Sequence, residues 1–208
     1  MFDDKKMRLY SRVFLYFVYL QMATPRQRRV YVASMNMRGQ WATRPEGVLT
    51  VNVTSAQSKT SAYRIDFSPM SPRPYRGFVC FENYWQAGKV FEGIDHAESV
   101  AWWQAQTKGK RRYPKGKGRR VLHAVFEGGD PLQYIESRKQ VYVPLYDALM
   151  RSSPSFDRLL QSDRDICVCD FDGPREEDGT PTCLEVTQDL LRTKLHDETF
   201  PFGHGYVV

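Results

Sequence analysis

The fold of this chain is best predicted from FENYWQAGKV, residues 81–90. Read at about 100° per residue, the segment predicts a helix over residues 81–91 with two distinct faces. One face holds the residues that suit a protein core, namely Phe81, Tyr84, Ala87, Gly88 and Phe91. The opposite face holds Glu82, Trp85, Gln86 and Lys89.

Trp85 is out of place on the outward face of this predicted helix, because surface helices normally present charged and small polar groups there. An aromatic ring between the carboxylate of Glu82 and the amine of Lys89 is typical of a pocket for a flat, polar ligand. The alternative is that Trp85 packs beneath a neighbouring loop while Glu82 and Lys89 are solvated.

Length and composition predict one folded domain over residues 22–208. The chain has 208 residues, of which 41% are hydrophobic and 13% aromatic, which is enough to bury a core without disulfides. Residues 1–21 form an N-terminal extension whose apolar run, Val13–Leu20, is too short to cross a bilayer as a helix. It is interpreted as a buried strand, as a segment upstream of a true start at Met22, or as a signal peptide. The first two are favoured, which predicts an intracellular protein with no membrane partner.

The positive charge is concentrated in a basic loop, residues 107–120. Eight Lys and Arg residues and no acidic residue lie between Lys108 and Arg120, and without them the net charge of +6 would become −2. Three glycines and a proline predict a loop that is mobile without a ligand. Such a local charge favours a specific anionic partner over a merely solvated flap. The loop either grips the backbone of a nucleic acid, with Tyr113 stacking on a base, or clamps the phosphates of a nucleotide-like ligand.

The cysteine and histidine pattern argues against a metal site. The cysteines are Cys80, Cys167, Cys169 and Cys183, and they form no CxxC pair. The four histidines are scattered along the chain. We therefore expect buried free thiols in a reducing compartment, with no structural zinc, disulfide or cofactor.

The remaining pattern predicts an α+β fold, a single mainly helical domain with a small antiparallel sheet. Strands are expected at residues 30–34, 48–53, 63–67 and 166–171. Helices are expected at residues 81–91, 95–103, 132–150, 155–160 and 187–195, the third of them kinked or split at Pro144.

Two carboxylates follow the strand Ile166–Phe171. Asp170 and Asp172 are two residues apart, so they share one face at the carboxyl end of this strand. If both are buried, their mutual repulsion requires a special environment for at least one of them. The alternatives are that both cap a solvent-exposed turn, or that they hold a divalent metal, for which no further ligands are evident.

The segment Glu82–Lys89 resembles the signature helix of the NADAR (YbiA-like) family, in which a glutamate, two aromatic residues, Gln-Ala and a lysine recur in that order. Residues 131–141, 145–150 and 156–160 are similar to the helices that follow it. Asp170 or Asp172 falls where the family keeps an aspartate after a strand. The chain departs from the family where Tyr134 or Ile135 replaces a tryptophan, at Pro144, in its longer basic loop and in lacking a closing Asn-x-Leu-Gly helix.

This resemblance implies a YbiA-like fold and an N-glycosidase that cleaves the bond between ribose C1′ and a nitrogen. The implied substrates are ADP-ribosylated or phosphoribosylated nucleotides. The implied nucleophile is Lys89, with Glu82 as general acid/base and Asp170 or Asp172 stabilising positive charge or activating water. The implied substrate-binding residues are Trp85, Gln86, Tyr84 and Tyr134, with Arg111, Arg112, Arg119 and Arg120 holding phosphates.

Two hypotheses from other classes stand beside the enzyme. The first is a non-catalytic nucleic-acid-binding protein that uses Lys108–Arg120 on the same scaffold. The second is a structural protein with a degenerate pocket.

Overall fold

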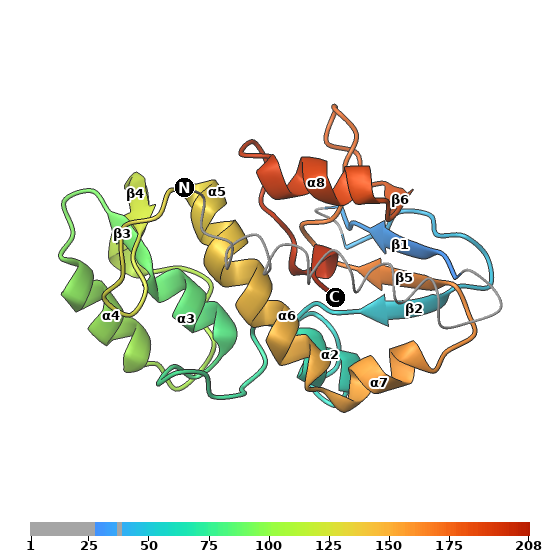
Figure 1. Cartoon of the computed structure of the whole chain (residues 1–208), viewed down its shortest axis with the longest axis horizontal. Coiled ribbons are helices and arrows are strands. Elements are labelled where there is room, and N and C mark those ends of the chain that lie inside the picture. Colours follow the sequence, from blue (N-terminus) through green and yellow to red (C-terminus); the bar gives the residue numbers. More distant parts are fainter. Residues whose placement is uncertain (1–27, 37–38) are drawn as a thin grey trace, which may run out of the picture.

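A computed structural model describes residues 28–36 and 39–208 of the chain (Figure 1). The N-terminal extension, residues 1–21, and its apolar run Val13–Leu20 lie outside the described residues. In the described part of the chain, no helix has the length and apolar character needed to span a bilayer.

A four-stranded mixed sheet forms one side of the molecule (Figure 1). Its strands, in spatial order, are β2 (Leu49–Asn52), β5 (Ile166–Cys169), β1 (Val30–Ala33) and β6 (Cys183–Glu185). Both β1 and β2 run parallel to β5, and only β6 is antiparallel to its neighbour, β1. The expected small antiparallel sheet was therefore wrong for this sheet, because the long helical connections between these strands allow parallel pairing.

The central strand β5 is buried along its whole length. Ile166 and Val168 face the main core, while Cys167 and Cys169 face a smaller cluster on the other side of the sheet. The sequence of a strand that is buried on both faces is a continuous apolar run, and this pattern is why β5 was predicted correctly.

Two short helices, α2 (Ala62–Phe67) and α7 (Pro154–Leu160), contribute to the main core beside the sheet. The strand expected at residues 63–67 was wrong, because Ser61 begins a helix there: its side chain accepts a hydrogen bond from the backbone of Arg64. An N-cap of this kind outweighs the alternating pattern of so short a segment.

The opposite lobe contains α3 (Phe81–Ala87), β3 (Lys89–Phe91), α4 (His96–Gln104), the 3₁₀ turn η1 (Pro114–Gly116) and β4 (Val121–Ala124) (Figure 1). Here β3 and β4 form an antiparallel pair in which Lys89 is opposite Ala124. The helix expected over residues 81–91 ends at Ala87, so Lys89 lies on a strand. A Cβ at Gly88 would come within 2.2 Å of the Phe126 ring, so the close contact between chain and ring requires glycine there.

A long helical rod crosses the molecule between the lobe and the sheet (Figure 1). It consists of α5 (Tyr134–Ser137), the π-helical segment η2 (Arg138–Tyr142) and α6 (Val143–Arg151). The N–H of Val143 donates to the carbonyl of Arg138, five residues earlier. Pro144 falls in the first turn of α6, where its missing N–H is tolerated. The irregularity expected at Pro144 thus takes the form of a π segment just before it.

The C-terminal segment packs across the end of β5. It follows α8 (Gln188–His196), whose predicted N-cap at Thr187 is confirmed, and ends in the 3₁₀ turn η3 (His204–Tyr206). A Cβ at Gly203 would lie 2.5 Å from Asp170 Oδ2, and one at Gly205 would lie 2.8 Å from Asp170 Cβ. The two glycines therefore allow this segment to approach β5 closely.

Candidate active site

A pocket of about 160 Å³ lies where α3, β3, the helical rod and the C-terminal segment meet. Six of its lining residues were predicted as site residues: Glu82, Trp85, Gln86, Lys89, Tyr134 and Asp172. The six that sequence reasoning missed are Pro69, Arg138, Tyr142, Pro201, Phe202 and His204.

Lys89 reaches the pocket from the first position of β3, immediately after the helix. Loss of hydration lowers the pKa of its ammonium below the ordinary value, and the nearby carboxylate of Glu82 opposes this only in part. Among the described residues, its Nζ has no hydrogen-bond or ion-pair partner. A half-buried amine with a lowered pKa and a free nitrogen is chemically suited to nucleophilic attack.

Glu82 lies in the first turn of α3, where its own N–H donates to the carbonyl of Pro69 at 2.9 Å. Burial raises the pKa of its carboxyl group, and the charge of Asp172 adds to this shift. The Gln86 amide, which donates to Glu82 Oε1 at 2.7 Å, acts in the opposite direction, as do Lys89 and His204. A carboxyl group that holds its proton to a higher pH is suited to act as a general acid.

Trp85 is buried, at 8% exposed, and does not lie on an outward face. Its ring stacks on Phe126 with centroids 5.5 Å apart and meets Tyr142 edge-on at 4.9 Å. The expectation of a surface helix was wrong because other elements cover both faces of α3. Trp85 therefore packs in the interior, as the alternative interpretation predicted, and it also lines the pocket.

Asp170 and Asp172 have separate environments although they follow the same strand. Asp170 is 1% exposed, and its Oδ2 accepts the N–H of Gly205 at 2.8 Å. Asp172 lines the pocket and is exposed to solvent. Partial burial and the charge of Asp170 raise the pKa of Asp172, while His204, Arg175 and Arg111 oppose the shift. Of the two aspartates, only Asp172 is placed to meet a ligand in the pocket.

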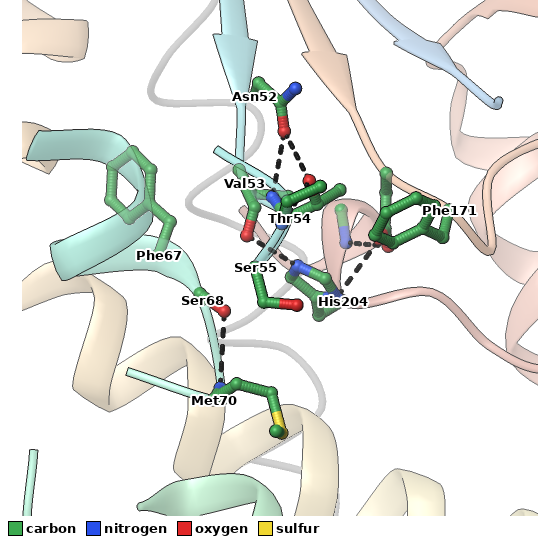
Figure 2. Close-up of polar contacts among 12 residues, drawn as sticks. Asn52, Val53, Thr54, Ser55, Phe67, Ser68, Met70, Phe171 and His204 are labelled. Atoms are coloured by element: carbon green, nitrogen blue, oxygen red, sulfur yellow. Dashed lines mark hydrogen bonds and ion pairs between the residues drawn. The ribbon is translucent and has the colours of Figure 1, made fainter. Parts of the chain in front are cut away.

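His204 lies beside Val53 (Figure 2). It lines the pocket and also contacts the buried Asp170. Its Nε2 lies 3.1 Å from the carbonyl oxygen of Val53, and its Nδ1 lies 3.2 Å from Asp170 Oδ1. A carbonyl oxygen only accepts, so Nε2 carries a proton. Nδ1 then faces the carboxylate of Asp170. The only sequence signal for this histidine was its position between two glycines.

Arg138 enters the pocket from the π-helical segment and is 1% exposed. Its Nη1 lies 2.9 Å from each of three backbone carbonyl oxygens, those of Lys194, Leu195 and Asp197. Its guanidinium lies 4.5 Å from the ring centre of Tyr134 and 5.0 Å from that of Phe202. Its buried Nη2 has no hydrogen-bond partner among the described residues.

The other predicted substrate-binding residues lie away from the pocket lining. Tyr84 is buried in an aromatic cluster with Tyr75 and Phe78. Arg111 is exposed, donates to Ser55 Oγ at 2.8 Å and influences the pKa of Asp172. Arg112, Arg119 and Arg120 are also exposed. None of these five residues lines the pocket.

The basic loop is anchored to the fold rather than detached from it. The N–H of Lys110 donates to Asn83 Oδ1 at 2.9 Å. Tyr113 is 4% exposed and packs against Phe91 and Trp102, so it is not available to stack on a base. All eight basic side chains nevertheless belong to exposed residues.

No group of three potential metal ligands comes together within residues 28–36 and 39–208. What the pocket does offer is a free amine, two carboxyl groups, an imidazole and a buried guanidinium, which suit acid–base and nucleophilic chemistry on a polar ligand. No family model matches this chain, and no curated protein or solved structure is significantly similar to it.

Proposed function

We propose that the pocket is the active site of an N-glycosidase. It cleaves the bond between ribose C1′ and a base or amine nitrogen, in an ADP-ribosylated or phosphoribosylated nucleotide-type substrate. The observation that carries the proposal is that Lys89, Glu82 and Asp172 line one pocket beside Trp85. This is the arrangement implied by the resemblance to the NADAR (YbiA-like) family, and it supports a YbiA-like scaffold.

In this mechanism the neutral amine of Lys89 attacks C1′ as the bond to the leaving nitrogen breaks. Glu82 donates its proton to the leaving nitrogen and recovers a proton from the attacking amine. The remaining proton on Nζ moves to the ring oxygen as the ribose opens, which leaves an imine between Nζ and C1′. Asp172 then activates a water molecule that hydrolyses the imine, releasing the ribose and restoring the amine.

The test is to incubate the protein with phosphoribosyl amines and with DNA carrying ADP-ribosylated guanine. The wild type should release the base or amine, and borohydride should reduce the imine to a stable ribose adduct on Lys89. Lys89→Ala and Glu82→Gln should lose release, and Lys89→Arg should lose it too, because an arginine stays charged. If the wild type releases nothing, or if these variants match it, the proposal fails.

A second candidate is nucleic-acid binding through the basic loop, favoured by the exposure of all its cations on an anchored segment. It predicts affinity for unmodified DNA or RNA that falls steeply with salt. Binding that does not depend on salt, or no binding, would contradict it.

A further inference from the structure

We propose that Arg138 forms an anion-binding subsite inside the pocket, and that this subsite takes the phosphate group of a small sugar phosphate. The sugar is inferred from the proposed function, whereas the anion subsite rests on the contacts of Arg138 alone.

The guanidinium of Arg138 is held in place without being neutralised. Its Nη1 donates to the carbonyls of Lys194 and Leu195, in the last turn of α8, and to that of Asp197, which ends the helix. These carbonyls form the negative end of the helix dipole, which attracts a cation but carries no full charge. No described carboxylate forms an ion pair with Arg138.

The second amino group is left for a ligand. Nη2 is buried and has no partner within residues 28–36 and 39–208, although a buried donor without a partner costs about 1–3 kcal/mol, and more when it is charged. Tyr134 and Phe202, against which the guanidinium packs, also line the pocket. An oxyanion bound there would complete the hydrogen bonding of Nη2 and supply the missing negative charge.

The size and charge of the pocket limit what binds there. Its volume of about 160 Å³ is below the roughly 300–1,000 Å³ of pockets that enclose a drug-sized ligand. Glu82 and Asp172 disfavour an anion in their part of the pocket, so the charged end of the ligand belongs near Arg138. The ligand fragment enclosed is therefore a sugar with one phosphate, and any larger group extends outside.

Calorimetric titration of the full chain with ribose 5-phosphate, ribose and inorganic phosphate tests the subsite. At 0.5 M NaCl, where attraction to exposed cations is largely screened, ribose 5-phosphate should bind the wild type about tenfold more tightly than ribose. Inorganic phosphate should compete with it. Equal affinities for the sugar and its phosphate would overturn the proposal.

Three variants test whether the preference for ribose 5-phosphate depends on Arg138. Arg138→Gln should abolish the preference for ribose 5-phosphate. Arg138→Lys keeps a cation near the α8 carbonyls, but its single ammonium group cannot serve both those carbonyls and the ligand, so the preference should fall several-fold even if the glutamine variant does not fold. Arg192→Gln, on the exposed face of α8, is the matched control and should keep the preference. If folded Arg138→Lys preferred ribose 5-phosphate over ribose as strongly as the wild type does, the proposal would be overturned.

The subsite proposal and the catalytic proposal can be tested independently of each other. Lys89→Ala should lose cleavage while keeping the preference for ribose 5-phosphate over ribose. If the wild type cleaves nothing but shows the preference, the subsite stands without the glycosidase. If the wild type cleaves the substrate but shows no preference for ribose 5-phosphate, the glycosidase proposal holds and the subsite proposal fails.

Discussion

The pocket and the basic loop carry positive charge in opposite ways. Lys89 and Arg138 are enclosed by aromatic residues and have little or no negative charge paired with them. The eight cations of residues 107–120 belong to exposed residues on the surface. Electrostatic interactions are stronger in a low-dielectric interior and are screened at the surface. Specific chemistry is therefore expected in the pocket, and long-range, salt-dependent attraction at the loop.

The largest expected effect is a difference in turnover between variants of two lysines, one in the pocket and one in the basic loop. Lys89→Ala should lower the turnover of a phosphoribosyl amine by about 10³-fold or more, since loss of a nucleophile removes the covalent pathway. Lys115→Ala, in the basic loop, should leave turnover within about twofold, because its ion pair with Glu98 is exposed. Base release followed by chromatography measures both. Similar losses of turnover in the two variants would contradict the expected difference between the pocket and the basic loop.

The converse experiment neutralises the loop. Changing Lys108, Lys110, Lys115 and Lys117 to glutamine should weaken single-stranded DNA binding by about 100-fold at low salt. The same change should make the salt dependence shallower by roughly 0.7 for each phosphate that is no longer neutralised. Turnover of a small substrate should persist. Fluorescence anisotropy between 50 and 200 mM NaCl provides the measurement, and an unchanged salt slope would show that the loop is not the nucleic-acid interface.

A third comparison uses the two aspartates at the end of β5. Asp170→Asn should lower the free energy of unfolding by about 2 kcal/mol, because Asp170 is buried and bonds both Gly205 and His204. Asp172→Asn should change stability by less than about 0.5 kcal/mol but reduce turnover. Urea unfolding at pH 7 measures the first effect. Equal destabilisation by the two variants would contradict the separate environments described above.

The smallest expected effect concerns stability and pH. Folding lowers the pKa of Lys89, so between that lowered value and the ordinary value near 10.5 the unfolded chain binds more protons at this residue. The contribution of Lys89 to stability therefore rises with pH across this window and is least favourable below it. Lys89→Met should stabilise the protein by about 1 kcal/mol at neutral pH, with an advantage that shrinks as pH rises.

Lys117→Met, in the exposed loop, is the matched control and should show no such pH-dependent difference. Unfolding free energies of the three proteins between pH 7 and 10 provide the data. A constant difference between wild type and Lys89→Met would mean that Lys89 is not desolvated.

Local signals explain what the sequence predicted well. The buried run of β5, the cap at Thr187 and the start of the helix at residue 81 each depend on adjacent residues, and all three are confirmed. Helical periodicity placed Lys89 beside Glu82 and Trp85 in a predicted pocket, but its strand was missed because the helix end depends on Phe126, far along the chain.

The remaining site residues depend on contacts that no local pattern reports. His204 is positioned by contacts with Asp170 and Val53, which come from two other segments. Arg138 looks like any arginine on an amphipathic helix until α8 and Phe202 enclose it. Parallel pairing likewise could not be inferred, because the partners of β5 lie more than a hundred residues away in the chain.

The π-helical segment η2 has a consequence for protein engineering. A π turn is equivalent to one extra residue in an α-helix, and each residue turns the helix by about 100°. Deleting Gln140 would convert the segment to regular α-helix and rotate Arg138 away from the side that carries Tyr142. The rod would remain helical while the guanidinium left the pocket. The one extra residue of the π turn therefore sets the direction in which Arg138 faces the pocket.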